Sequence, residues 1–321
     1  AVYPPFIHST GALMSEPAAI FTLPAAVLAF LWADSRQSRW AWIAPGILFG
    51  LTALIRPEYL AVAFAFGILL LVRAWQRSDS PGRAKGKASA LRGLVFALAV
   101  FLPIVPWTVH NYVSLDRVVP ITTGSGKAGF VGTYLPADGE YQRVKATLYE
   151  KYTGEVLEPG SQELDDVDPV PLFDREAGAY PQLSRDAALG RLGKDNFRQY
   201  LREDPLGYAG MTVRKVGRMW GSGVGEAMSS PIGALAQKLL VLAGLAGLLL
   251  LALRRNWQAI PVAIPIGVVT AVGALTLAPA RRNEILMTLI LPLAAVAFVE
   301  AWTRIRPSRG DPESKATGET A

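Results

Sequence analysis

The sequence predicts an all-α, polytopic membrane protein with about seven transmembrane helices and one long extracytoplasmic segment that carries surface helices. Hydrophobic residues make up 51% of the 321 residues, and mean hydropathy is positive. These residues come in blocks long enough to span a bilayer, instead of recurring with the period of a soluble core. Because backbone groups in hydrocarbon must be hydrogen-bonded within their own segment, we expect each block to be a helix.

Seven apolar blocks are the predicted spans. They cover residues 13–33, 40–55, 58–73, 93–109, 232–253, 257–279 and 285–302. The second and third blocks meet at Arg56-Pro57-Glu58, inside the stretch GLTALIRPEYLAVAF. Proline ends a helix, so this junction predicts a tight helical hairpin. The chain then divides into a four-span part (1–109), an extracytoplasmic loop domain (110–230), a three-span part (231–303) and a disordered cytoplasmic tail (304–321).

Lysine and arginine predict the orientation of these spans. The loop from Arg73 to Arg92 holds six positive residues against the single acid Asp79, and such loops stay in the cytoplasm. Alternation places the other strongly basic short loops and the C-terminal tail on the same side. Tryptophans near the span ends fit an aromatic belt. We therefore expect a multi-pass protein of the cytoplasmic (inner) membrane, with its working site on the extracytoplasmic side.

The predicted external segment, residues 110–230, holds most of the 26 acidic residues of the chain. Its early part, VVPITTGSGKAGFVGTYLP, is rich in glycine and β-branched residues, which predicts loop or short strand. Its middle, EVLEPGSQELDDVDPVPLFDREAG, is acidic and interrupted by proline, which predicts an irregular loop. Helical spacing from Leu183 to Trp220, broken at Asp204-Pro205, predicts helices that lie along the membrane surface.

Several common cofactor and metal motifs are excluded by the residues present. Cysteine is absent, so the chain has no disulfide framework and no zinc-thiolate site. The stretch TTGSGKAG fails the phosphate-loop pattern, because Ile121 occupies a required glycine position and Ala128 follows Lys127. The acidic run at 163–168 lacks the spacing of a calcium-binding EF-hand loop. We expect no cofactor and no nucleic-acid partner, and the need for a divalent metal stays open.

Three arginines on the predicted outer side, Arg56, Arg281 and Arg282, break the topology rule. Charge at this depth is expensive, which makes these residues candidates for a functional site. The planar guanidinium fork of arginine matches a phosphate group, and a lipid-linked phosphate sits at that depth. In the alternative interpretation, Arg56 pairs with Glu58, Arg282 pairs with Glu284, and the remaining charges reach the lipid headgroups.

Glu16, just inside the outer end of the first span, is the candidate catalytic carboxylate. It can act as a general base or orient a sugar hydroxyl, and it shares a helical face with Ser9 if that helix starts early. The alternative is a helix-start residue, because Ser15-Glu16-Pro17 also suits helix initiation. Other polar residues of the external segment are possible substrate contacts: His110, Asn111, Lys127, Lys215 and Arg218.

Five segments in this order resemble one superfamily. They are YPPFIHSTGALMSEPAAIF, GILFGLTALIRPEYL, FLPIVPWTVHNYVSLDRVVPITTGSGKAGFVG, FRQYLREDPLGYAGMTVRKVGRMW and APARRNEILMTLILPLAA. Together they resemble the C-type membrane glycosyltransferases. The closest group looks like glycosyltransferase family 39, which comprises dolichyl-phosphate-mannose protein mannosyltransferases and aminoarabinose transferase relatives.

The resemblance implies transfer of a sugar from a polyprenyl-phosphate donor, in the membrane lipid, to a glycan, lipid or protein acceptor at the outer face, with inversion. Glu16 matches an acidic position of the family, and Arg56 with Arg281 or Arg282 matches basic positions near the donor phosphate. His110 departs from the pattern, because relatives usually carry arginine there. The main catalytic acid of the family lies on a loop that would precede Ala1, so we expect an N-terminally truncated chain.

Two other functions remain alternatives to an enzyme. One is a lipid-linked sugar flippase or another polytopic transporter, and the other is a noncatalytic subunit of a cell-envelope complex. Transporters often carry internal repeats and midplane charges. Here the candidate charges lie at the outer rim and no repeat is evident, which favours the enzyme.

Overall fold

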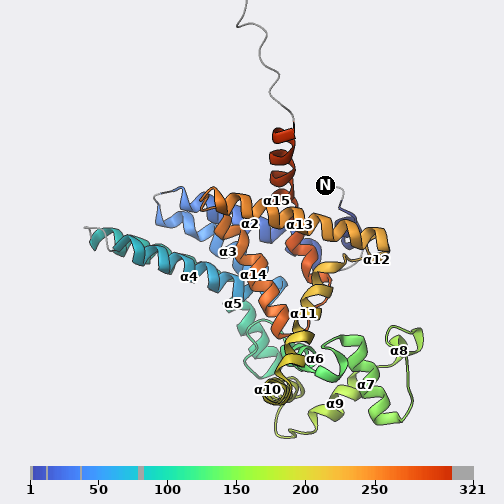
Figure 1. Cartoon of the computed structure of the whole chain (residues 1–321). Coiled ribbons are helices and arrows are strands. Elements are labelled where there is room, and N and C mark those ends of the chain that lie inside the picture. Colours follow the sequence, from blue (N-terminus) through green and yellow to red (C-terminus); the bar gives the residue numbers. More distant parts are fainter. Residues whose placement is uncertain (1–2, 12–13, 37, 79–82, 306–321) are drawn as a thin grey trace, which may run out of the picture.

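The computed structural model describes residues 3–11, 14–36, 38–78 and 83–305. Within these ranges the chain forms helices and no strand, which confirms the predicted all-α class. Figure 1 shows a bundle of long helices with a group of shorter helices, α6 to α10, gathered at its lower end. We call residues 125–221, from the start of α6 to the end of α11, the loop domain.

Each of the seven predicted spans is a helix, with shifted ends. The helices are α2 (Glu16–Asp34), α3 (Ile43–Ile55), α4 (Tyr59–Ser78), α5 (Arg83–Leu115), α13 (Pro231–Leu253), α14 (Ala259–Leu275) and α15 (Arg281–Ile305). By length and composition, α2, α13, α15 and the Ala90–Leu115 part of α5 can cross a membrane, and α3, α4 and α14 are shorter apolar helices. The chain is therefore described as a multi-pass membrane protein.

Contacts at one end of the bundle support the predicted alternation of the helices. Arg73, late in α4, donates to Asp34 at the end of α2, with 2.8 Å between Nη1 and Oδ1. The Arg73 guanidinium also lies 4.0 Å from the ring centre of Trp257, which directly precedes α14. Because the ends of α2 and α4 meet the beginning of α14, these helices run in the directions that alternation requires. The sidedness of the membrane stays a prediction.

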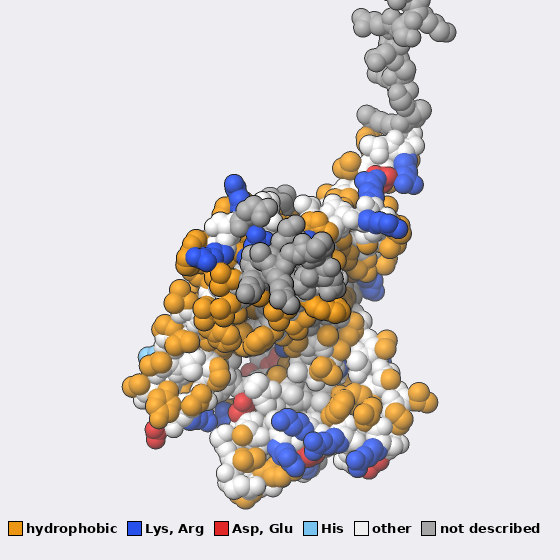
Figure 2. All heavy atoms as spheres, turned by 90° about the vertical axis from the view of Figure 1, so that its left-hand side faces the viewer, with side chains coloured by type: hydrophobic (Ala, Val, Ile, Leu, Met, Phe, Trp, Pro, Cys, Tyr) orange, Lys and Arg blue, Asp and Glu red, His pale blue; other side chains and the backbone are white. Residues whose placement is uncertain are grey.

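Aromatic side chains fill the core between α2, α3, α4 and α5. The ring of Phe66 lies 4.6 Å from that of Phe30 and 4.5 Å from that of Phe49, and all three are fully buried. Large apolar side chains such as Leu98 and Leu242 instead face outward. Figure 2 shows hydrophobic side chains over the body of the molecule, with charged side chains gathering over its lower part and along its upper edge. An apolar outer surface of this kind is what lipid contact requires.

The loop domain contains more helix than the sequence predicts. Its helices are α6 (Ser125–Thr133), η2 (Leu135–Ala137), α7 (Tyr141–Thr153), α8 (Gln162–Asp166), α9 (Val170–Ala177), α10 (Arg185–Glu203) and α11 (Pro205–Gly221). A second core, around Phe130, Leu148, Phe173 and Leu189, holds α6, η2, α7, α9 and α10 together. Three other short helices complete the described chain: α1 (Pro4–Thr10), η1 (Arg39–Trp42) and α12 (Glu226–Ser229).

Two predictions for the loop domain were wrong. The glycine-rich stretch predicted as loop or strand contains α6, and the acidic stretch predicted as irregular contains α8 and α9; α7 was not predicted at all. Helix α6 depends on a distant residue, because Asp186 Oδ1 accepts hydrogen bonds from the N–H groups of Gly126 and Lys127, at 2.9 and 3.2 Å. Ser161 caps α8 in the same way from nearby, accepting from the Leu164 N–H.

The helices predicted between Leu183 and Trp220 are confirmed as α10 and α11, with the break at Asp204-Pro205. Asp204 ends α10 and caps α11, accepting a hydrogen bond from the Gly207 N–H at 2.8 Å. Of the predicted tail, residues 304–321, the first two belong to α15, and the remainder lies outside the described residues. The division of the chain into four parts stays a prediction.

Candidate functional site

The turn between α3 and α4 sends the side chains of Arg56 and Glu58 to separate partners. Helix α3 ends at Ile55, and Arg56 takes an extended backbone conformation, with φ −142° and ψ 108°. Pro57 follows, and the Tyr59 N–H donates to the Arg56 carbonyl at 3.0 Å as α4 begins. The predicted helical hairpin is confirmed.

Arg56 forms an ion pair with Glu16 in the first turn of α2. Arg56 Nη2 donates to Glu16 Oε1, and the two side chains are 12% and 4% exposed. The second Glu16 oxygen, Oε2, lies 3.4 Å from the Ser15 hydroxyl. Glu16 therefore both begins a helix and carries a buried, paired carboxylate, so the two interpretations of this residue are compatible.

Arg282, in the first turn of α15, reaches Glu58. Arg282 Nε lies 3.6 Å from Glu58 Oε1, and both side chains are nearly buried. Arg282 Nη1 also donates to the Thr276 hydroxyl at 3.1 Å. The two local pairings considered from the sequence, Arg56 with Glu58 and Arg282 with Glu284, are replaced by two long-range ones.

Glu284 is buried, one helical turn into α15. Ser9 donates a hydrogen bond to Glu284 Oε1, so Ser9 does not share a face with Glu16 as proposed; α1 ends at Thr10 and α2 begins only at Glu16. Glu284 Oε2 and Arg56 Nε have no hydrogen-bond partner among the described residues. Both atoms are buried, so each is a polar group that the described residues leave unsatisfied.

A cavity of about 500 Å³, which we call the rim cavity, lies at this end of the bundle. Its lining includes Glu16, Arg56, Glu58 and Arg281, together with Trp107. Arg281 is exposed and makes no ion pair to the described residues, whereas Arg282 is held behind it by Glu58. The three arginines thus gather at one end of the bundle, opposite the end where Arg73 meets Asp34. An arrangement of guanidinium groups beside a carboxylate can bind a phosphate and accept a proton.

A larger cavity of about 1210 Å³, the basic cavity, lies between the loop domain and the helices α13 and α15. Six cationic residues line it: Lys127, Arg214, Lys215, Arg218, Lys238 and Arg281. It therefore contains three of the predicted substrate contacts. Arg281 belongs to the lining of both cavities.

Lys215 joins the loop domain to the segment after α14, and Arg218 forms a contact within the loop domain. Lys215 Nζ is buried and donates to the carbonyls of Gly132 and Thr276, at 2.6 and 3.1 Å. Burial, reinforced by the neighbouring charge of Arg218, lowers the pKa of Lys215 to about 8. Arg218 Nη1 donates to Asp138 Oδ2, and Arg214 Nη2 donates to Asp138 Oδ1 at 2.8 Å. Burial opposes the ionised form of Asp138, but these hydrogen bonds outweigh it and hold the pKa of Asp138 below its usual range.

The other two predicted contacts lie near the end of α5. Asn111 is buried and donates to the carbonyls of Val119 and Ile121, at 3.0 and 3.2 Å, so its amide fixes the following loop. His110 is exposed, and its ring centre lies 5.4 Å from that of Trp107. Sequence reasoning missed Lys238, although a lone lysine inside an apolar span is a recognisable signal. Among the described residues, no cluster of three histidine or acidic side chains has the geometry to hold a metal ion.

The N-terminal helices carry the sequence signal of a known family. Residues 1–116 match the family model of the dolichyl-phosphate-mannose-protein mannosyltransferases. The match confirms the resemblance over α1 to α5, the part that contains Glu16, Arg56 and Glu58. It supports a membrane glycosyltransferase that uses a lipid-linked sugar donor. Searches of curated proteins and of solved structures found no match. The resemblance of the later segments, including Arg281 and Arg282, stays a prediction.

Proposed function

We propose that this protein transfers a sugar from a polyprenyl-phosphate donor to an acceptor at the outer face of the cytoplasmic membrane. One observation carries the proposal: Glu16, Arg56 and Arg281 line a single cavity at the end of the bundle opposite the Arg73–Asp34 pair. The mannosyltransferase match also supports the donor class, and it covers the residues 1–116 that contain Glu16 and Arg56.

The proposed reaction is a single displacement at the anomeric carbon of the donor sugar. An acceptor hydroxyl, or a similar nucleophile, forms a bond to this carbon as the bond to the phosphate oxygen breaks. The polyprenyl phosphate leaves with the bonding electrons, and the configuration of the sugar is inverted. The proton of the acceptor passes to a carboxylate, a role for which Glu16 Oε2 is available.

The arginines take different roles in this proposal. Arg56 and Arg281 face the rim cavity, where their charge would offset the negative charge that develops on the departing phosphate. Arg56 lines the rim cavity while its Nη2 is held by Glu16, so the ion pair would fix the guanidinium beside a bound phosphate. Arg282 is already engaged with Glu58 and Thr276. We therefore propose that it positions the turn between α3 and α4 and adds positive charge close to Arg281.

The experiment that tests this function compares variants of the full-length protein in membranes. Sugar transfer is measured with a labelled polyprenyl-phosphate sugar. Glu16→Gln and Arg56→Gln are each expected to lower the initial rate by about 100-fold, the usual scale for losing a proton acceptor or an oxyanion-stabilising charge. Arg56→Lys keeps the charge but loses the planar fork, so it is expected mainly to raise the KM for the donor.

The matched control is Arg254→Gln. Arg254 pairs with Glu300 near the end of α15, at the far end of the bundle, so this variant should retain normal transfer. Resistance to alkaline extraction shows that each variant is inserted in the membrane. Unchanged transfer in both Glu16→Gln and Arg56→Gln would remove the rim cavity from the reaction.

A further inference from the structure

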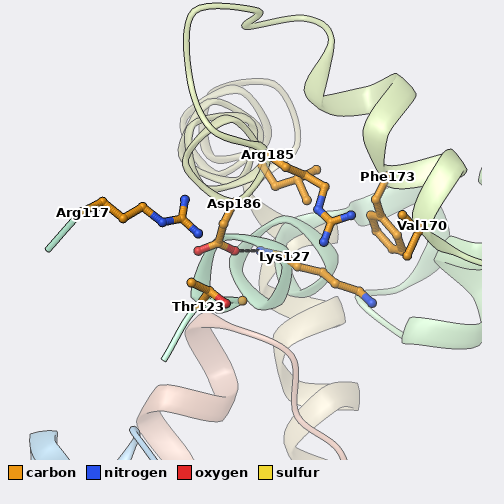
Figure 3. Close-up of a pocket in the computed structure, with 9 residues that line it drawn as sticks. Arg117, Thr123, Lys127, Val170, Phe173, Arg185 and Asp186 are labelled. Carbon is orange, nitrogen blue, oxygen red and sulfur yellow. Dashed lines mark hydrogen bonds between the residues drawn. The ribbon is translucent and has the colours of Figure 1, made fainter. Parts of the chain in front are cut away.

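A third cavity, of about 330 Å³, lies between the loop domain and the segment that follows α5, and it is also basic. Arg117, Lys127 and Arg185 line it, together with Asp186 and Phe173. Figure 3 shows the guanidinium groups of Arg117 and Arg185 on either side of the Asp186 carboxylate. We call this the outer pocket.

Asp186 is the carboxylate in the described lining of the outer pocket, and it is hydrogen-bonded to the protein backbone. Asp186 Oδ1 accepts the two N–H groups at the start of α6. Arg185 has an exposed partner, Asp174, at 3.3 Å, and Arg117 makes no ion pair to the described residues. The pocket therefore presents more positive charge than its lining neutralises.

The basic cavity likewise has more positive than negative side chains in its described lining. Glu140 is the carboxylate in its described lining, and Glu140 already pairs with Arg143 at 2.9 Å. Asp138, behind Arg214 and Arg218, supplies one negative charge for two arginines. Lys238 makes no ion pair to the described residues, and the Lys127 ammonium lies over the rings of Tyr141 and Phe173, at 4.7 and 4.6 Å. Unpaired cations lining a concave surface attract anions.

The basic cavity shares lining residues with each of the other two cavities. Gly124 and Lys127 line both the outer pocket and the basic cavity. Arg281 lines both the basic cavity and the rim cavity. Cationic side chains therefore form a connected track from the loop domain to the cavity that holds Glu16.

We propose that this track binds the acceptor, and that the acceptor is an elongated glycan bearing phosphate or carboxylate groups. The inference rests on the proposed function, since it places the growing end of the acceptor beside Arg281. Several anionic groups on one chain would engage the outer pocket and the basic cavity together, and linked contacts raise affinity far above that of one contact.

Two other kinds of anionic partner fit the track less well. The described residues contain no strand, so they offer no sheet edge to which an extended acidic peptide could add. A lipid headgroup carries its charge at one anchored point, so it would not fill the outer pocket, the basic cavity and the rim cavity together. An elongated anionic glycan needs no sheet edge, and it can place several charged groups in the cavities at once.

The test is a binding titration of the full-length protein in detergent micelles, with galacturonic acid oligomers as the probe. We expect octagalacturonate to bind at least about tenfold more tightly than digalacturonate, because only the longer chain reaches both cavities. Maltooctaose, which has the same number of sugars and no charge, should not bind measurably. The double variant Arg117→Gln/Arg185→Gln should weaken octagalacturonate about tenfold and leave digalacturonate unchanged, and Lys238→Gln should weaken both.

The control variant Lys194→Gln removes an exposed lysine of α10 that lines neither cavity. Affinity independent of oligomer length would overturn the proposal. So would an equal loss in Lys194→Gln, which would indicate general charge attraction, or equally tight binding of octaglutamate, which would indicate a peptide partner.

A second titration separates this inference from the proposed function. Farnesyl phosphate, a mimic of the donor lipid, should bind in a way that Arg56→Gln weakens and that Arg117→Gln/Arg185→Gln leaves intact. If farnesyl phosphate binds as expected and the galacturonate oligomers do not, only the acceptor inference is contradicted. If the galacturonate oligomers bind as expected and farnesyl phosphate does not, the donor site of the proposed function is contradicted.

Discussion

Arg282 at the start of α15 and Glu58 in the turn before α4 form an ion pair, with 3.6 Å between Nε and Oε1. Arg56, two residues before Glu58, pairs with Glu16 at the start of α2. One short turn thus connects the N-terminal ends of two helices from opposite halves of the chain. The rim cavity depends on these two pairs for its shape.

Removing the arginine of the buried pair should cost stability. Arg282→Ala leaves Glu58 buried without its partner, and breaking such a pair typically costs about 3–5 kcal/mol. Arg281→Ala is the matched control, because the neighbouring arginine is exposed and makes no ion pair to the described residues. Thermal unfolding in detergent should show a clear drop in Tm for Arg282→Ala and little change for Arg281→Ala. Equal drops would mean that the pair does not hold the turn.

Helix α6 should not tolerate a side chain at Gly132. A Cβ atom at this position would lie 2.1 Å from the backbone carbon of Thr276, in the segment between α14 and α15. We expect Gly132→Ala to destabilise the protein by about 1–3 kcal/mol, the usual cost of overpacking. Gly129→Ala, in the same helix with nothing within 4 Å of the added atom, should be neutral or stabilising. Equal Tm values for the two variants would contradict this prediction.

The buried lysine at the domain junction should make stability rise at alkaline pH. Burial lowers the pKa of Lys215 from 10.5 to about 8 in the folded protein. Between these values the unfolded chain binds more protons, so the Lys215 contribution to the free energy of unfolding increases with pH. The difference between wild type and Lys215→Met, measured by denaturant titration from pH 7 to about pH 10, should grow by a few kcal/mol. A difference that stays constant would show that Lys215 keeps an ordinary pKa.

The cluster of Asp138 with Arg214 and Arg218 should lose its contribution in acid. The pKa of Asp138 is held below 3.8, its ordinary value, chiefly because hydrogen bonds from the two arginines outweigh the effect of burial. A lowered folded-state pKa stabilises the protein above the unfolded value, and this stability is lost as pH falls through the folded value. The Tm difference between wild type and Asp138→Asn should therefore shrink between about pH 5 and pH 2. A difference unaffected by acid would contradict the ionised cluster.

The sequence by itself determined the helical framework of this protein. Continuous apolar blocks in hydrocarbon leave the backbone no alternative to helix, so α2 to α5 and α13 to α15 were predictable. Pro57 gave the hairpin between α3 and α4, and Asp204-Pro205 gave the break between α10 and α11, because proline cannot continue a helix from the preceding residue. Arg56, Arg281 and Arg282 were candidates for a site because charge near hydrocarbon is costly.

Only the tertiary structure decided which charges pair. Arg282 and Glu284 lie two residues apart on α15, and side chains at that spacing do not face each other on a helix; packing instead carried Arg282 to Glu58 and Glu284 to Ser9. Helix α6 likewise depends on Asp186, sixty residues later in the chain, so its glycine-rich sequence alone predicts a loop. Tertiary packing also places Lys238 of α13 beside the loop domain, in the lining of the basic cavity. Local pattern encodes period and length, whereas these contacts join segments far apart in the chain, and only the packed structure fixes their distance.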